Sequence, residues 1–213
     1  VTVGAVLAMA AHVDGKGVGM IEMAGLAQKG GAVHIHMRIA EKPEHINAIR
    51  VATGEAHAVI GGDLVTTAGA KTLALMRDGQ TGAVVNAADI ITGHFTRDIN
   101  FKLPHDRMVL ALQARLKDRL QLFDAQALSR VLLGDSIYSN MMILGAAWQA
   151  GLVPVSHDAL MRAIELNGQA VEGNRRAFEI GRWAVAEPEK AGAMLAPEVP
   201  REKTLAERIA FRE

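Results

Sequence analysis

Short, mostly apolar runs, two of which end in glycine or asparagine, alternate along this chain with longer segments of helical character. Such runs occur at residues 57–62 (His-Ala-Val-Ile-Gly-Gly), 82–86 (Gly-Ala-Val-Val-Asn) and 120–123 (Leu-Gln-Leu-Phe). Segments predicted as helices lie between them, at residues 63–77 and from Pro104 onward. Strands that alternate with helices form mostly parallel sheets with helices on both faces. The sequence therefore predicts an α/β fold.

The two ends of the predicted domain differ in character. Residues 1–13 are apolar and predict a helix that ends at Gly15, and two further strands are expected at residues 18–23 and 33–39. In the second of these strands Val33, Ile35, Met37 and Ile39 alternate with polar residues, which is typical of a half-buried strand. The C-terminal part is helical, with Ser136 and Ser156 as candidate N-caps and helices predicted at residues 125–133, 136–150 and 156–185.

We expect one domain over residues 1–187. Beyond Pro188 the chain contains further prolines and glutamates, which suggests a linker, and residues 204–213 resemble the start of a further region. The first residue is Val and no capping residue precedes the first helix, so we expect that the turn before this helix is missing from the sequence.

Composition excludes several classes of function. Lys plus Arg (23) balances Asp plus Glu (23), which gives no electrostatic basis for binding nucleic acid. No apolar run reaches the roughly 18–20 residues that span a bilayer. Cysteine is absent. Disulfides, thiolate catalysis and cysteine-ligated metal clusters are therefore excluded within this sequence.

The strongest local feature is the loop Gln28-Lys29-Gly30-Gly31. Two glycines allow backbone N–H groups to approach an anion, and Lys29 adds a positive charge, which suits a phosphate or a carboxylate. The alternative is a tight turn between two strands with an exposed lysine. The order of residues differs from that of a P-loop, in which the lysine follows the last glycine.

His34 and His36 share one face of a predicted strand. They could approach a common metal ion, but zinc needs three or four ligands and the spacing provides no third one. Edge or surface histidines are the favoured interpretation, and no metal site is predicted.

A second candidate for ligand contact is the head of the helix after residue 135. Asp135, Ser139 and Asn140 lie there, and the free N–H groups of a helix N-terminus attract anions. Simple capping by Asp135 and Ser136 is the alternative. Met141, Met142, Leu144 and Trp148 follow at helical spacing and are expected in the core.

The polar face of the last predicted helix, with Asn167 and residues 172–176 (Glu-Gly-Asn-Arg-Arg), is either solvated or turned towards a partner domain. No Gly-x-Ser-x-Gly motif occurs, and the catalytic residues remain unknown.

Several of these segments together resemble the gamma domain of 2-oxoacid:ferredoxin oxidoreductases. They are residues 1–11, 25–33, 134–145, 163–168 and 174–178, which occur in the order and spacing of that family. The segments Ala27-Gln-Lys-Gly-Gly31 and Ala163-Ile-Glu-Leu-Asn-Gly168 are most similar to indolepyruvate oxidoreductase, in which the domain belongs to a beta subunit or to a fused chain. The resemblance implies a Rossmann-like fold.

It also implies an assembly that decarboxylates a 2-oxoacid on thiamine diphosphate and Mg²⁺, transfers electrons through an iron–sulfur cluster to ferredoxin or a similar acceptor, and forms an acyl-CoA. In the family the thiamine and iron–sulfur domains lie elsewhere, so the resemblance implies a thiamine-binding partner, an oligomeric assembly and a cytoplasmic location. It places Gln28, Lys29, Gly30, Gly31 and Asn140 near the cleft that admits coenzyme A.

Two alternatives of other classes remain open. The chain could be a structural interaction domain without ligand contacts. It could instead be a nucleotide-binding dehydrogenase, although no Gly-x-Gly-x-x-Gly motif stands between a strand and a helix.

Overall fold

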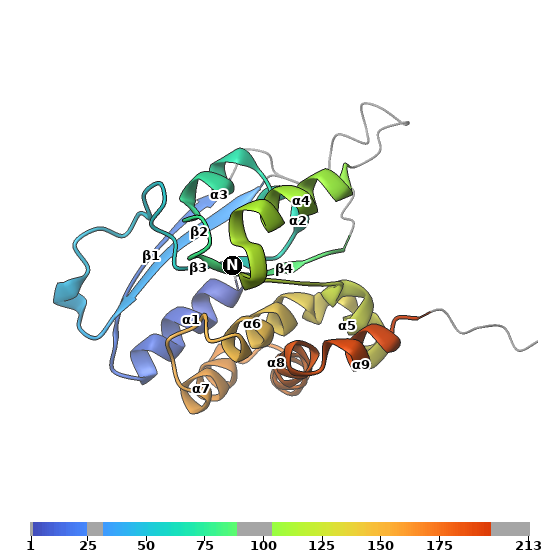
Figure 1. Ribbon diagram of the computed structural model, residues 1–213. Coiled ribbons are helices and arrows are strands. Elements are labelled where there is room, and N and C mark those ends of the chain that lie inside the picture. Colours follow the sequence, from blue (N-terminus) through green and yellow to red (C-terminus); the bar gives the residue numbers. More distant parts are fainter. Residues whose placement is uncertain (1, 25–31, 89–103, 197–213) are drawn as a thin grey trace, which may run out of the picture.

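The computed structural model describes residues 2–24, 32–88 and 104–196 of the chain (Figure 1). Three of the expected strands form one parallel sheet: β3 (Ala58–Gly61), β4 (Gly82–Asn86) and β5 (Leu120–Phe123), in the order β3-β4-β5. The central strand β4 is buried along its whole length. Because both faces of such a strand are covered, its side chains are apolar without alternation, as the sequence of β4 indicates.

The other two strands form a separate antiparallel sheet. β1 (Gly17–Ala24) pairs with β2 (Val33–Ala40), with Gly17 opposite Ala40 and Ala24 opposite Val33. The two predicted strands are thus confirmed, but they pair with each other rather than extending the parallel sheet.

Helices cover both faces of the parallel sheet, as predicted (Figure 1). One layer consists of α2 (Leu64–Thr67), α3 (Ala70–Leu75) and α4 (His105–Leu116). The opposite layer consists of α1 (Thr2–Val13), α5 (Ala125–Leu133), α6 (Ser139–Gln149), α7 (His157–Asn167), α8 (Val171–Ala186) and α9 (Pro188–Ala193). Short 3₁₀ turns occupy residues 43–45, 117–119 and 136–138. In the described part of the chain, no helix has the length and apolar character needed to cross a membrane.

One predicted helix, over residues 63–77, is wrong in its extent. Its sequence forms α2 and α3, because Gly69 is extended (φ −66°, ψ 147°) and Met76 forms an isolated parallel bridge with Ala56. At the break between the two helices, a threonine hydroxyl donates to a backbone carbonyl: Thr72 Oγ1 donates to the Thr66 carbonyl at 2.8 Å. Such local bonds compete with the helical pattern.

Two further helix predictions need correction at their boundaries. The segment 156–185 is divided into α7 and α8, because Gly168 adopts a left-handed conformation (φ 70°) that ends α7. The segment 136–150 begins as a 3₁₀ turn, and its cap is Asp135, which accepts a bond from the Ile137 N–H, rather than Ser136. Ser156 caps α7 as predicted, accepting from the Ala159 N–H. Residues 188–193, at the start of the expected linker, form α9, whose Ala191 packs into the core.

Helices α6 and α8 pack closely in a core that contains few aromatic residues. Gly145 faces the backbone of Phe178, and Gly181 faces the backbone of Met142, so closely that a Cβ atom at either glycine would overlap those atoms. Met141, Met142 and Leu144 are buried, as expected, and Trp148 is partly buried against the same core. The two glycines therefore set the distance between the helices.

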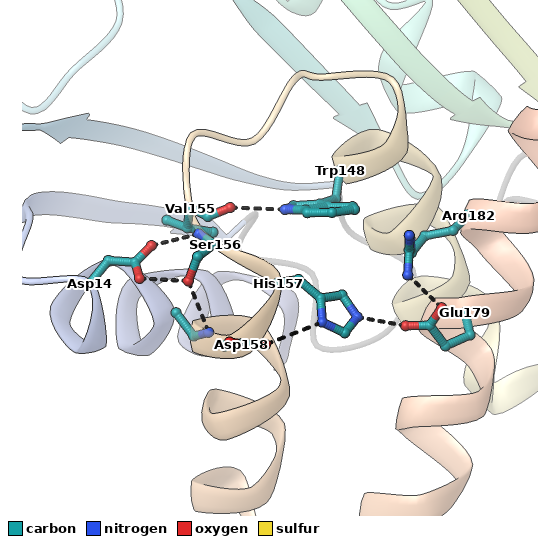
Figure 2. Close-up of polar contacts among 9 residues, drawn as sticks. Asp14, Trp148, Val155, Ser156, His157, Asp158, Glu179 and Arg182 are labelled. Atoms are coloured by element: carbon teal, nitrogen blue, oxygen red, sulfur yellow. Dashed lines mark hydrogen bonds and ion pairs between the residues drawn. The ribbon is translucent and has the colours of Figure 1, made fainter.

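A group of polar contacts connects three helices of this layer (Figure 2). The Trp148 indole N–H donates to the Val155 carbonyl at 2.8 Å, and the Arg182 guanidinium lies 4.8 Å from the centre of the Trp148 ring. His157 Nε2 donates to Glu179 at 2.7 Å, and Arg182 binds the other oxygen of the same carboxylate at 2.6 Å. These contacts join α6, α7 and α8.

Candidate functional site

The carboxyl ends of the parallel strands meet at one edge of the sheet, where ligands bind in folds of this kind. Gly61 ends β3 and is followed by Gly62 and Asp63, Asn86 ends β4, and Asp124 follows β5.

Asn86 holds the three strand ends together. Its side chain is 2% exposed. Its Nδ2 donates to the Gly62 carbonyl at 3.2 Å, and its Oδ1 accepts from the N–H groups of Ala88 (3.2 Å) and Ala125 (3.1 Å). With these three bonds, the amide is a structural element of the site and has little capacity left for a ligand.

Asp63 organises the turn after β3. Its carboxylate accepts from the Thr66 N–H at 2.6 Å, and the Thr67 hydroxyl donates to its carbonyl at 2.5 Å. Gly61 cannot be replaced freely, since a Cβ atom there would overlap the Thr67 side chain. The turn is therefore compact, with one carboxylate at the sheet edge.

Asn140, predicted from the head of its helix, lies next to this turn. It is exposed in the first turn of α6, and its side chain makes no hydrogen bond with another residue that the structure describes. A Cβ atom built on Gly62 would lie 3.4 Å from Asn140 Oδ1. The amide is thus available at the edge of the sheet. The other predicted ligand-proximal residues, Gln28, Lys29, Gly30 and Gly31, lie outside the described residues.

A cavity of about 610 Å³ opens beside β3. Its walls are formed by β2, by β3, by the first two turns of α1 and by the start of α6, and Asn140, Gly62 and Asp63 line one part of it. None of its lining residues comes from α7 or α8. The cavity thus joins the predicted site at Asn140 to a region between the two sheets.

His34 and His36 of β2 both line the cavity, but each has a structural partner. Thr72 Oγ1 already donates to Thr66, so His34 Nε2 must be the donor in its 3.2 Å bond to that hydroxyl. His36 Nδ1 accepts from the Val51 N–H at 3.0 Å. Within the described ranges no group of three His, Cys, Asp or Glu side chains could hold a metal ion.

The protonation of His36 follows from its surroundings. Burial of the imidazole lowers the pKa of His36 below its usual value, and the charges of Arg50, His34 and Arg38 act in the same direction. Because the Val51 N–H needs an unprotonated Nδ1, the neutral ring is the form that fits this structure.

Arg38, whose positive charge lines the cavity, also has partners. Arg38 binds Glu55 at 2.6 Å and the Arg50 carbonyl at 3.2 Å. The hydrogen bond from the Ala52 N–H and the contact with Arg38 lower the pKa of Glu55 below its usual value. This ion pair anchors the 50–55 segment beside β2 and leaves Arg38 little freedom to bind an anion.

Two residues of the predicted polar face, Asn174 and Arg175, make local bonds, whereas Asn167 Oδ1 is buried without a hydrogen-bond partner among the described residues. Asn174 Nδ2 donates to the Gln169 carbonyl at 2.7 Å, and Arg175 pairs with Glu165 and Glu172. Glu165 has a pKa below its usual value, because Arg162 and Arg175 bind its carboxylate. These bonds connect α7 and α8 at the turn between them, and the residues that make them do not line the cavity.

Sequence reasoning missed the roles of Asp63, Thr66 and His57 as lining residues of the cavity. The Gly-Gly-Asp sequence directly after a buried strand was the available signal for Asp63. No local pattern indicates Thr66 or His57, because they reach the cavity through the break between α2 and α3 and through the segment before β3.

The family model described as pyruvate ferredoxin/flavodoxin oxidoreductase matches residues 1–184. No protein of curated function matches the sequence.

Two solved structures share the fold. The gamma subunit of a keto/oxoacid ferredoxin oxidoreductase from Geobacter sulfurreducens PCA has 21% sequence identity and a TM-score of 0.58, over 86% of this chain and 89% of that chain. The pyruvate oxidoreductase subunit PORC from Thermotoga maritima has 18% identity and a TM-score of 0.53, over 84% of this chain and 85% of that chain.

Proposed function

We propose, from the premise that the chain belongs to the pyruvate ferredoxin/flavodoxin oxidoreductase family, that it is the domain of a 2-oxoacid oxidoreductase that does not bind thiamine. The family match over residues 1–184 is the observation that carries this proposal. The gamma-subunit fold supports it, because a subunit of that kind is one part of a larger enzyme.

The proposed reaction converts a 2-oxoacid and coenzyme A into an acyl-CoA and CO₂, and it releases two electrons and one proton. We assign thiamine diphosphate, Mg²⁺ and the iron–sulfur cluster to a thiamine-binding partner, from which the electrons reach ferredoxin or a similar acceptor. The absence of cysteine supports this division, since a cluster needs thiolate ligands. The similarity of residues 27–31 and 163–168 to indolepyruvate oxidoreductase makes aryl pyruvates the proposed substrates. We place the assembly in the cytoplasm as an oligomer.

The part of the cavity beside Asn140 is the proposed contribution of this chain to the path of coenzyme A. The Asn140 amide is unbonded among the described residues, and residues from the N-terminal turns of α1 and α6 line this part of the cavity. Asp63 lies in the same wall, and Arg38 is held by Glu55. A phosphate would therefore depend on helix N–H groups, on Asn140 and on the predicted loop cation Lys29.

The test is a measurement of the KM for coenzyme A in the complete assembly. Asn140→Ala and Lys29→Ala are expected to raise this KM at least threefold, with indolepyruvate as substrate and a viologen dye as electron acceptor. Gln113→Ala on the exposed face of α4 and Lys190→Ala on α9 are matched controls that should leave it unchanged. Unchanged values in the first pair would favour a structural domain without ligand contacts.

A further inference from the structure

Helix α1 lies at the surface of the protein but carries no charged side chain there. Its sequence, Thr2–Val13, contains no Asp, Glu, Lys or Arg. The exposed residues of this helix are Thr2, Ala5, Met9, His12 and Val13. With 3.6 residues per turn, these positions fall within one arc of about 100°, so they form a single strip along the helix. We call this strip the outer face of α1.

The outer face contains large apolar side chains. Met9 is 41% exposed and Val13 is 43% exposed, whereas Val6, Leu7 and Ala10 on the inner side of the helix are buried. A helix that is apolar on all sides is typically buried on all sides. We therefore expect the outer face to be covered in the assembled enzyme.

The neighbouring surface is different in character. Helix α7 packs against α1 and exposes Asp158, Arg162 and Glu165. The charged residues that follow α1, Asp14 and Lys16, are bonded to other parts of the chain. The lack of charge is thus a property of the outer face of α1 and not of this side of the fold. Such a face loses little hydration energy when an apolar surface covers it.

The size and position of the outer face indicate what covers it. At a rise of 1.5 Å per residue, α1 is about 18 Å long, and one side of so short a helix cannot supply the roughly 800 Å² per partner of a stable interface. The occupant must therefore also cover adjoining surface. Thr2 belongs to the outer face and also lines the cavity that contains Asn140. In the proposed function, coenzyme A passes this cavity to reach the thiamine-binding partner, so the partner lies at the same end of α1.

We propose that the outer face of α1 is a docking surface for the thiamine-binding partner, which covers it with the apolar face of a helix. The small side chain of Ala5 permits close approach of the two helices, and Met9 and Val13 fill the grooves on either side of the contact. The identity of the occupant rests on the proposed function. The location of the surface rests on the exposure of Met9 and Val13 and on the absence of charge.

The test compares the dissociation constants of chain variants for the purified thiamine-binding partner, loaded with thiamine diphosphate and Mg²⁺. Met9→Glu and Ala5→Glu are each expected to weaken binding at least tenfold, because a carboxylate would be buried in an apolar contact. Both variants introduce a good helix former at an exposed position, so their thermal unfolding should match that of the wild type. Leu110→Glu is the matched control, since Leu110 is 62% exposed on α4, in the opposite helical layer (Figure 1).

Three results would overturn the proposal. They are wild-type affinity of the Met9→Glu variant, an equal loss of affinity in the Leu110→Glu variant, and no binding of the wild-type chain to the partner. Sedimentation of the chain alone examines the other occupant: a dimer that Met9→Glu dissociates would assign the face to a second copy and would also overturn the proposal.

The docking surface and the proposed function can fail separately. Coenzyme A-dependent turnover in the combined sample, together with wild-type affinity of Met9→Glu, would leave the function standing and overturn the docking surface. Weaker binding by Met9→Glu, in a sample without turnover, would support the docking surface and refute the function.

Discussion

Asp14 and Ser156, which lie 142 residues apart in the sequence, are joined by two hydrogen bonds (Figure 2). The Asp14 carboxylate accepts from the Ser156 N–H at 2.6 Å and from the Ser156 hydroxyl at 2.7 Å. The same hydroxyl caps α7 by accepting from the Ala159 N–H at 3.1 Å. The end of α1 and the start of α7 are thereby fixed to each other.

Replacement of Asp14 by alanine should lower the free energy of unfolding by about 1 kcal/mol, because the bonds are charge-assisted but partly solvated. Ser156→Ala should cost more, since it also removes the α7 cap. Urea denaturation measures both, with Asp118→Ala as an exposed control. Equal stability of Asp14→Ala and the control would contradict a stabilising role for the contact between Asp14 and Ser156.

The stability contributed by the contact between Asp14 and Ser156 also depends on pH. Burial works against ionisation of Asp14, but the two bonds from Ser156 and the charge of Lys16 outweigh it, so the pKa of Asp14 is lowered in the folded protein. Its contribution to stability is therefore present above the unfolded value of 3.8 and is lost as the pH falls through the folded pKa.

A second prediction concerns the two glycines between α6 and α8. Gly145→Ala and Gly181→Ala should each lower the free energy of unfolding by about 2 kcal/mol or more, because the added methyl group overlaps the backbone of the facing helix. Gly192→Ala is the matched control, since no atom lies within 4 Å of a Cβ there and α9 gains helix propensity. Thermal unfolding separates these outcomes, and a stable Gly181→Ala variant would be incompatible with the packing described.

A third prediction distinguishes the two asparagines of the site. Asn86→Ala should lower the free energy of unfolding by about 2–4 kcal/mol, because it leaves two buried N–H groups and one carbonyl without partners. Asn140→Ala should leave stability unchanged within about 0.5 kcal/mol, since that side chain is exposed and unbonded among the described residues. Chemical denaturation of both variants checks the contrast, which would be refuted by similar losses.

A fourth prediction follows from His36. Its pKa is lowered in the folded protein, so the neutral ring contributes stability above the unfolded value of 6.5, and this contribution is lost as the pH falls through the folded pKa. The free energy of unfolding should therefore decrease between pH 7 and pH 5, above the range in which Asp14 titrates. His36→Asn should flatten this part of the profile, whereas the exposed control His12→Asn should retain the wild-type slope. Parallel profiles for all three proteins would rule out this role.

The parallel sheet was predictable because its strands have local signatures. Ala83, Val84 and Val85 form a continuous apolar run that ends in a polar residue, and all three are fully buried. The antiparallel pairing of β1 with β2 was only implied by one alternative, a tight turn between two strands at residues 28–31, because alternation of side chains shows that a segment is a strand but does not show its partner.

The break between α2 and α3 was missed for a different reason. Apolar periodicity continues through residues 63–77, and the hydroxyl bonds of Thr67 and Thr72 that interrupt the helix depend on where the neighbouring backbone lies. In the candidate site, too, local features were predictable and long-range contacts were not. Asn140 could be predicted from its place at a helix start, whereas the bonds of Asn86 join residues up to 39 positions apart.

The central claim is that this chain contributes structure and a few polar groups to a reaction whose redox centres lie on a partner. Its most direct test is reconstitution, with coenzyme A-dependent oxidation of indolepyruvate measured for the chain alone, for the thiamine-binding partner alone and for the two together. We predict turnover only in the combined sample. Turnover by the chain alone, or turnover by the partner that the chain does not increase, would contradict the claim.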